Sequence, residues 1–136
     1  MMSKLLQRLR DPARSGVYRT GNDRAIVDAV RGAPLDVVAI DARENPFDSM
    51  ARALGFPDWF GRNWDALEDL LGDLSWRNGE GHVLIFHGYP AGAELGTLLD
   101  VLASSAEYWA GRGKPFFAVF VDPDKKLALP DLYREA

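Results

Sequence analysis

The sequence predicts an α/β fold: a three-stranded parallel sheet with helices packed on it, and room for an extra N-terminal strand and helix. Three segments are almost continuously apolar and rich in β-branched or aromatic residues, namely 35–41, 82–87 and 115–121. Segments of helical periodicity separate them, and this alternation is typical of a parallel sheet covered by helices. The 136 residues include no cysteine, so we expect one domain that is held by its core alone.

Residues 1–34 are expected to form an N-terminal extension that packs on the same domain. A helix is predicted over residues 3–10, where leucines recur at helical spacing before Asp-Pro ends the pattern. Residues 15–20 allow a brief strand. A second helix is predicted from Asn22, which can act as its N-cap, through Val30.

Residues 35–121 form the predicted central domain, which opens with the strand 35–41. The first helix after it starts at Pro46, with Asn45 as its N-cap, and ends at Gly55. A second helix is predicted from Asn63 to Gly72, because its apolar residues recur on one side.

The second half of this domain repeats the alternation. The strand 82–87 is followed by a long helix over 92–110, and a turn over 111–115 leads into the strand 115–121. The C-terminal tail, 122–136, begins with a turn and has too few apolar residues to require a fixed position.

The charge and the chain termini restrict the classes of partner. The net charge is −4, so we expect no direct binding of nucleic acid and no attraction to an anionic membrane. The first residues have no apolar run of signal-peptide length, and no segment reaches the roughly 20 apolar residues of a membrane span. The expected location is therefore the cytoplasm, and an acidic protein suits a basic partner.

The sequence favours neither a catalytic site nor a metal or cofactor site. His82 and His87 stand five residues apart on one strand, so alternation points them to opposite faces, and we expect both to meet solvent or cap a loop. Asp65 and Asp69 could serve as a general acid and base, but both fall on the solvent side of a helix, where carboxylates stay ionised. An acid-dependent hydrolase is therefore the weakest of three functional hypotheses.

Three of the four tryptophans lie beside a row of carboxylates in the stretch GFPDWFGRNWDALEDLLGDLSW, residues 55–76. Helical spacing places Asp65, Glu68 and Asp69 opposite the apolar residues of their helix. The preceding loop presents Trp59 beside Asp58 and Gly61. An aromatic anchor next to preorganised carboxylates suits a basic, concave site such as the phosphate-binding cleft of a nuclease.

The segment LGFPDWFGRNWDALEDLL, residues 54–71, resembles the barstar family of intracellular ribonuclease inhibitors. The resemblance extends more weakly over 35–121, through the strand VVAID before the segment and HVLIFH, the long helix and FFAVFV after it. It implies a three-stranded parallel sheet with packed helices, and a protein that inhibits rather than catalyses.

By this resemblance, the loop aromatic that contacts the nuclease corresponds to Trp59, and Asp69 is the principal anchor that mimics a phosphate. The sequence departs from the family pattern at two positions. Glu68 stands where the family has an interface tryptophan, for which Trp76 is one replacement. Tyr108 stands where the family has an acidic residue. The full set of expected partner-binding residues is Asp58, Trp59, Gly61, Arg62, Asn63, Asp65, Glu68, Asp69 and Trp76.

Two hypotheses of different classes remain. In the first, the protein binds a basic, extracellular-type ribonuclease one to one and blocks its active site. In the alternative, it is an interaction module of the same fold that binds another basic protein without inhibiting a nuclease. The N-terminal extension and the altered residues leave the identity of the partner open.

Overall fold

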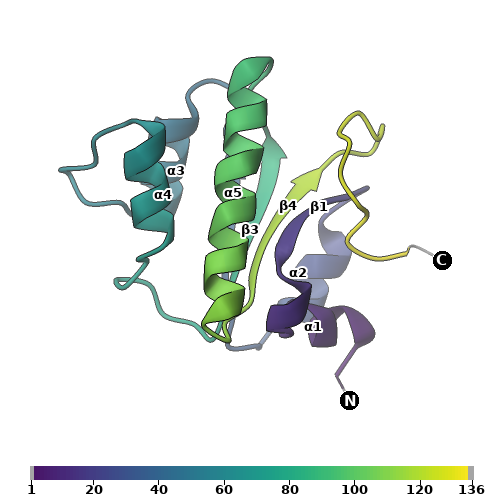
Figure 1. Cartoon of the computed structure of the whole chain (residues 1–136). Helices are drawn as coiled ribbons and strands as arrows, with labels where there is room; N and C mark the ends of the chain where they lie inside the picture. The colour runs from purple at the N-terminus through teal and green to yellow at the C-terminus, as the bar shows by residue number, and fades with distance from the viewer. Residues whose placement is uncertain (1, 135–136) are drawn as a thin grey trace.

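The chain folds around one four-stranded parallel sheet with the strand order β1-β4-β3-β2 (Figure 1). The structure is a computed structural model that describes residues 2–134. Its strands are β1 (Gly16–Thr20), β2 (Asp36–Asp41), β3 (His82–Gly88) and β4 (Phe116–Val121). The predicted parallel α/β fold is confirmed, but the sheet has four strands rather than three. The added strand, β1, lies next to β4 and is only partly buried, so it lacks the continuous apolar run of the other strands.

The described residues also form five α-helices and one short 3₁₀ helix, of which α1 and η1 precede the first strand. They are α1 (Lys4–Leu9), η1 (Pro12–Arg14), α2 (Arg24–Val30), α3 (Pro46–Leu54), α4 (Trp64–Leu71) and α5 (Ala93–Gly111). The predicted N-cap of α2 is wrong by one residue: Asp23 occupies that position, while the Asn22 side chain accepts a hydrogen bond from the Arg24 amide at 3.0 Å. Among residues 2–134, no helix combines the length and apolar character that crossing a membrane requires.

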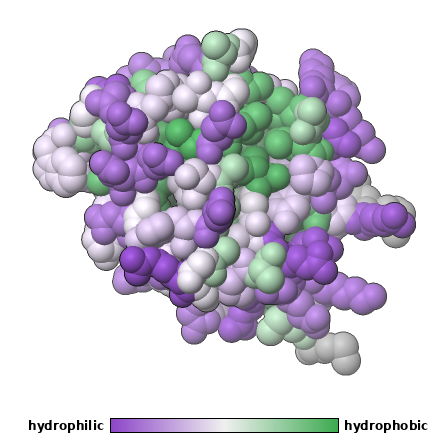
Figure 2. All heavy atoms as spheres, in the orientation of Figure 1, coloured by the Kyte–Doolittle hydropathy of each residue, from purple (hydrophilic) through white to green (hydrophobic). Residues whose placement is uncertain are grey.

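The sheet has a separate hydrophobic core on each face. Alternate residues of β3 point to opposite sides, so that Leu84 and Phe86 join one core while Val83 and Ile85 join the other. Helices α3, α4 and α5 supply apolar residues to the first core, and α1 and α2 to the second. Figure 2 shows that hydrophobic residues gather beside α5, whereas most of this face of the molecule is hydrophilic.

The described part of the C-terminal tail packs on the sheet, although its sequence has too few apolar residues to require a fixed position. The Arg19 amide donates to the Pro130 carbonyl, and the Leu132 amide donates to the Arg19 carbonyl, each at 2.9 Å. The Leu132 side chain is fully buried in the second core. The tail thus satisfies backbone groups on the outer edge of β1. Residues 135 and 136 of the predicted tail lie outside the described residues.

Candidate functional site

Helix α4 separates an apolar face from an acidic one. Leu67 and Leu71 are fully buried against the core. Asp65, Glu68 and Asp69, which we call the acidic ridge, are exposed on the other side. These three carboxylates therefore lie opposite the apolar face of the helix, as the sequence predicts. The buried leucines hold the helix, so the ridge presents its charges from a fixed backbone.

Asn63 fixes the start of this helix and the end of the loop before it. Its Oδ1 accepts a hydrogen bond from the Ala66 amide at 2.8 Å, which is N-cap geometry. Its Nδ2 donates to the Gly61 carbonyl at 3.3 Å. A Cβ atom on Gly61 would lie 3.2 Å from that Nδ2, so a larger residue would crowd the contact. One side chain therefore ties the loop to the ridge.

The loop before α4 has an apolar base and an exposed tip. Phe60 is buried against Phe56, with ring centroids 4.9 Å apart, and against Phe47 of α3 at 6.3 Å. Between these anchors Trp59 is 76% exposed, and the neighbouring Asp58 is exposed too. The loop therefore holds its indole at the surface from an anchored base.

Arg62 binds back onto the protein. Its φ is +53°, a left-handed conformation that is uncommon for a residue other than glycine. Its guanidinium forms an ion pair with Asp48 of α3. The one cation predicted for the binding surface is thus paired with α3 and does not neutralise the acidic ridge.

The acidic ridge has no counterion of its own. Within residues 2–134, no ion pair includes Asp58 or any of the three ridge carboxylates. Negative charges that are clustered and unpaired produce a local potential that attracts cations. The geometry is therefore suited to recognising a basic surface.

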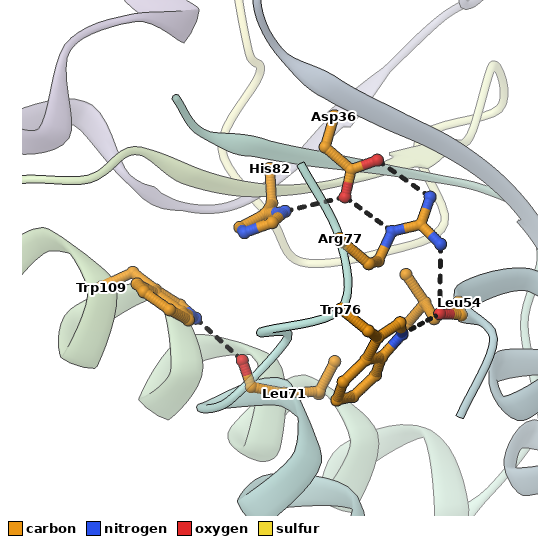
Figure 3. Close-up of polar contacts among 7 residues, drawn as sticks. All are labelled: Asp36, Leu54, Leu71, Trp76, Arg77, His82 and Trp109. Atoms are coloured by element: carbon orange, nitrogen blue, oxygen red, sulfur yellow. Dashed lines mark hydrogen bonds and ion pairs between the residues drawn. The ribbon is translucent and has the colours of Figure 1, made fainter. Parts of the chain in front are cut away.

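Trp76 lies on the segment after α4, and its indole is bound to the end of α3 (Figure 3). Nε1 donates to the Leu54 carbonyl at 2.8 Å, and the ring packs edge-on against Phe56 at 6.0 Å between centroids. The side chain is still 38% exposed. It contributes to the structure through these contacts and leaves one part of the ring available at the surface.

Sequence reasoning missed a partly buried polar cluster at the start of β2 and β3. Asp36 Oδ2 lies 2.8 Å from His82 Nδ1, and Arg77 donates to both carboxylate oxygens at 2.7 and 2.9 Å (Figure 3). His82 is 1% exposed, so the expectation that it would meet solvent or cap a loop is wrong. No local pattern reveals the cluster, because its three residues meet only when β2 and β3 pair.

Burial and hydrogen bonding shift two pKa values in this cluster. Burial lowers the pKa of His82 below its ordinary 6.5, although the neighbouring Asp36 opposes this shift. Burial alone would raise the pKa of Asp36, but hydrogen bonds from Arg77 and His82 outweigh it and hold that pKa below 3.8. Arg77 also donates to the Leu54 carbonyl at 3.1 Å, so the cluster and Trp76 share an acceptor.

Tyr108 and Trp109 connect α5 to the end of α4. Trp109 Nε1 donates to the Leu71 carbonyl at 2.8 Å, while Tyr108 is 44% exposed and borders the acidic ridge (Figure 3 shows the Trp109 bond). Tyr108 takes the place where the family resemblance implied an acid. The surface next to Asp69 is consequently aromatic on one side.

The side chains of the candidate site are mostly exposed carboxylates and aromatic rings. Its carboxylates are exposed, whereas a general acid with a raised pKa is usually buried in apolar surroundings. Within the described chain, no group of three or more His, Cys, Asp or Glu side chains is arranged to hold a metal ion.

Comparison with known proteins agrees with the fold. The family model described as "Barstar (barnase inhibitor)" matches residues 31–121, which is more than half of the chain and includes the loop and the acidic ridge. A search of curated proteins and a search of solved structures found no match. The chain therefore belongs to the barstar family.

Proposed function

We propose that this protein is an inhibitor that binds a basic, extracellular-type ribonuclease one to one and blocks its active site with α4 and the preceding loop. The family description names an inhibitor of a nuclease, barnase. In this role the protein acts in the cytoplasm as an immunity protein, and it is not an enzyme.

The observation that carries this proposal is the acidic ridge, which belongs to no ion pair within residues 2–134 and follows the loop that holds the exposed Trp59. A ribonuclease holds the RNA backbone with basic side chains in a concave site. The ridge presents carboxylates at the spacing of one helical turn, and it can occupy the place of phosphates there.

Each part of the surface has a separate role in this mechanism. The unpaired charges accelerate encounter with a basic partner, so the association rate falls as salt is added. Trp59 then buries its indole and slows dissociation. Asp69 forms charge-assisted hydrogen bonds with active-site cations, and the bound protein excludes RNA.

The proposal is tested by capturing the partner from the native host. Tagged wild-type protein is compared with the double variant Asp65→Ala, Asp69→Ala, and captured proteins are identified by mass spectrometry. Asp100→Ala is the matched control, because Asp100 is an exposed acid on α5 that takes part in no ion pair within residues 2–134.

We expect wild type and Asp100→Ala to capture a basic ribonuclease and to inhibit it. The double variant should neither capture nor inhibit that ribonuclease. A basic protein without ribonuclease activity would contradict inhibition and favour the interaction module. Equal capture by the double variant would show that the ridge is not the binding surface.

A further inference from the structure

A pocket lies at the carboxyl ends of β1 and β4, on the side of the sheet where the tail runs beside β1 (Figure 1). It is open to solvent and encloses about 340 Å³. The end of β1, the turn after β4 and the C-terminal tail each supply part of its lining. Segments that are distant in the sequence therefore meet around one hollow.

The chain leaves β1 and β4 toward opposite faces of the sheet, although the two strands are neighbours. After β1, α2 places Ile26 in the second core, whereas the tail after β4 places Leu127 in the first core. A crevice opens outside the carboxyl ends of parallel strands where neighbouring connections diverge in this way, and small molecules commonly bind in such crevices. The pocket therefore occupies the position of a ligand site in an α/β fold.

Arg19 is the fixed cation of this pocket. Its Nε donates to Asp131 Oδ1 and its Nη1 donates to the Leu127 carbonyl, each at 2.8 Å. The side chain is only 19% exposed. A guanidinium has five N–H donors, and these two bonds within residues 2–134 engage two of them. Arg19 is thus held in place by the tail while several of its donors remain for a ligand.

The two carboxylates of the lining are bound to donors of the protein itself. Asp122 is 3% exposed, and its oxygens accept hydrogen bonds from the amides of Lys126 at 3.0 Å and Leu127 at 2.8 Å. Asp131 is paired with Arg19. Neither acid therefore makes the pocket a receptor for a cation.

Two further cations line the pocket without a counterion. Lys125 and Arg134 are exposed, and neither belongs to an ion pair within residues 2–134. The hydrogen bond from Arg19 lowers the pKa of Asp131 most, and the charge of Lys125 lowers it further, so Lys125 lies close to this pair. The pocket consequently collects positive charge on a protein whose net charge is −4.

We propose that this pocket binds a small phosphate monoester, with its phosphate on Arg19, Lys125 and Arg134 and its organic part against Pro123 and Tyr133. This site goes beyond the proposed function, because all of its lining residues lie outside residues 31–121, which the family model matches. It shares no residue with the acidic ridge or the loop that carries Trp59.

A phosphate monoester suits three cations better than other anions do. It carries up to two negative charges and three acceptor oxygens, and a guanidinium can bind two of those oxygens at once. A carboxylate has one charge and two oxygens, so it leaves one cation without a partner. Ligand pockets usually span roughly 300–1,000 Å³, so a pocket at the lower end of this range fits a small metabolite rather than a polymer.

The test is an NMR titration of the isotope-labelled, full-length protein at constant ionic strength. The probes are inorganic phosphate, phenyl phosphate, which adds an aromatic ring, and phenol, which has the ring without the phosphate. We expect phosphate to shift the amide signals of Gly21, Lys125 and Arg134 saturably. Phenyl phosphate should bind more tightly at the same signals, and phenol should not shift them.

Three outcomes of the titration would overturn the proposal. Phosphate shifts that are absent, or equally large at exposed cations elsewhere such as Lys4, would show that the pocket is not a phosphate site. Equal shifts with phenol would show that the cations do not select the ligand. Phenyl phosphate that binds no more tightly than phosphate would contradict the place assigned to the organic part.

Variants separate the pocket from the general charge of the surface. Lys125→Gln and Arg134→Gln should each weaken phosphate binding about fivefold, since each removes one charge-assisted contact. Lys126→Gln is the matched control: Lys126 is exposed and adjacent in the sequence but does not line the pocket, so phosphate binding should be unchanged. Wild-type affinity in Lys125→Gln and Arg134→Gln, or equal weakening in Lys126→Gln, would contradict the assigned site.

Discussion

At the scale of single residues, the carboxylates of this protein fall into two kinds. Those of the acidic ridge are exposed and have no ion-pair partner within residues 2–134. Asp36, by contrast, is largely buried and bound to Arg77 and His82. Removal of a ridge acid should therefore affect partner binding, whereas a change at His82 should affect stability.

Asp69→Ala should weaken the complex most and leave the fold intact. The loss of charge-assisted hydrogen bonds should cost at least about 2 kcal/mol, or roughly thirtyfold in Kd. The free protein should unfold at the same temperature or at a slightly higher one. Alanine is a better helix former than aspartate, and the substitution removes the repulsion between Asp69 and Asp65, four residues before it. Titration calorimetry and thermal unfolding measure the two effects. A Kd equal to that of Asp100→Ala would contradict the role of Asp69.

The stability of the protein should fall as the solution becomes acidic. His82 has a lowered pKa, so the unfolded chain takes up its proton at a higher pH than the folded chain does. The free energy of unfolding should therefore decrease as the pH falls below 6.5. Asp36 adds a further loss at more acidic pH, because its pKa lies below 3.8 in the folded state.

Urea unfolding at a series of pH values checks this dependence. His82→Gln should flatten the slope between about pH 7 and pH 5. If the free energy of unfolding of the wild type instead rises as the pH is lowered through this interval, the folded state holds His82 in its charged form.

The two kinds of carboxylate also differ in how far the sequence predicts them. The ridge follows from helical periodicity and the Asn63 cap, which are local patterns. The Asp36 cluster joins residues about 40 positions apart, so it depends on strand pairing that no local pattern displays. The pairing of Arg62 with Asp48 was hidden as well, because it depends on how the loop before α4 folds back onto α3.

At the scale of elements, α4 and its loop form one unit that the Asn63 side chain connects. Asn63→Ala removes the N-cap and the contact with Gly61, and should lower the free energy of unfolding by about 1 kcal/mol. It should also raise the dissociation rate of the complex, because the loop that carries Trp59 loses a restraint.

Asn63→Ser is the matched control, since a serine hydroxyl can cap the helix. Urea unfolding and surface plasmon resonance measure the two effects. Wild-type stability in Asn63→Ala would show that the cap contributes nothing. A dissociation rate as slow as that of wild type would show that the loop holds its position without it.

Element boundaries were predictable where a cap or a breaker marks them. Asn45 and Gly55 enclose α3 as expected, with Gly55 at a φ of +68°. Strand β1 gave only a weak signal because it is short and partly buried. The fixed position of the tail could not be predicted, because the environment of Leu132 comes from segments distant in sequence.

At the scale of the whole molecule, segments outside the family match complete the fold. The match begins at residue 31 and ends at residue 121, yet β1, α1, α2 and the tail lie outside it. Strand β1 extends the sheet next to β4, while α1, α2 and the tail cover the face that α3, α4 and α5 leave open and form a second core there. The acidic ridge lies on α4, which packs on the other face of the sheet.

Leu132→Ala should test whether the tail stabilises the molecule. The side chain is fully buried, so its truncation should cost about 2–4 kcal/mol of unfolding free energy. Lys126→Ala, an exposed change in the same tail, should alter stability by less than about 0.5 kcal/mol. Equal melting curves for the two variants would show that the tail contributes no stability.

The inhibition titration tests the central claim most directly. The captured partner is held at a fixed concentration, and its ribonuclease activity is measured as the protein is added. We predict that wild type abolishes the activity at one equivalent, that Asp100→Ala does the same, and that Asp69→Ala requires a large excess. Full ribonuclease activity in the presence of saturating wild-type protein would contradict the account.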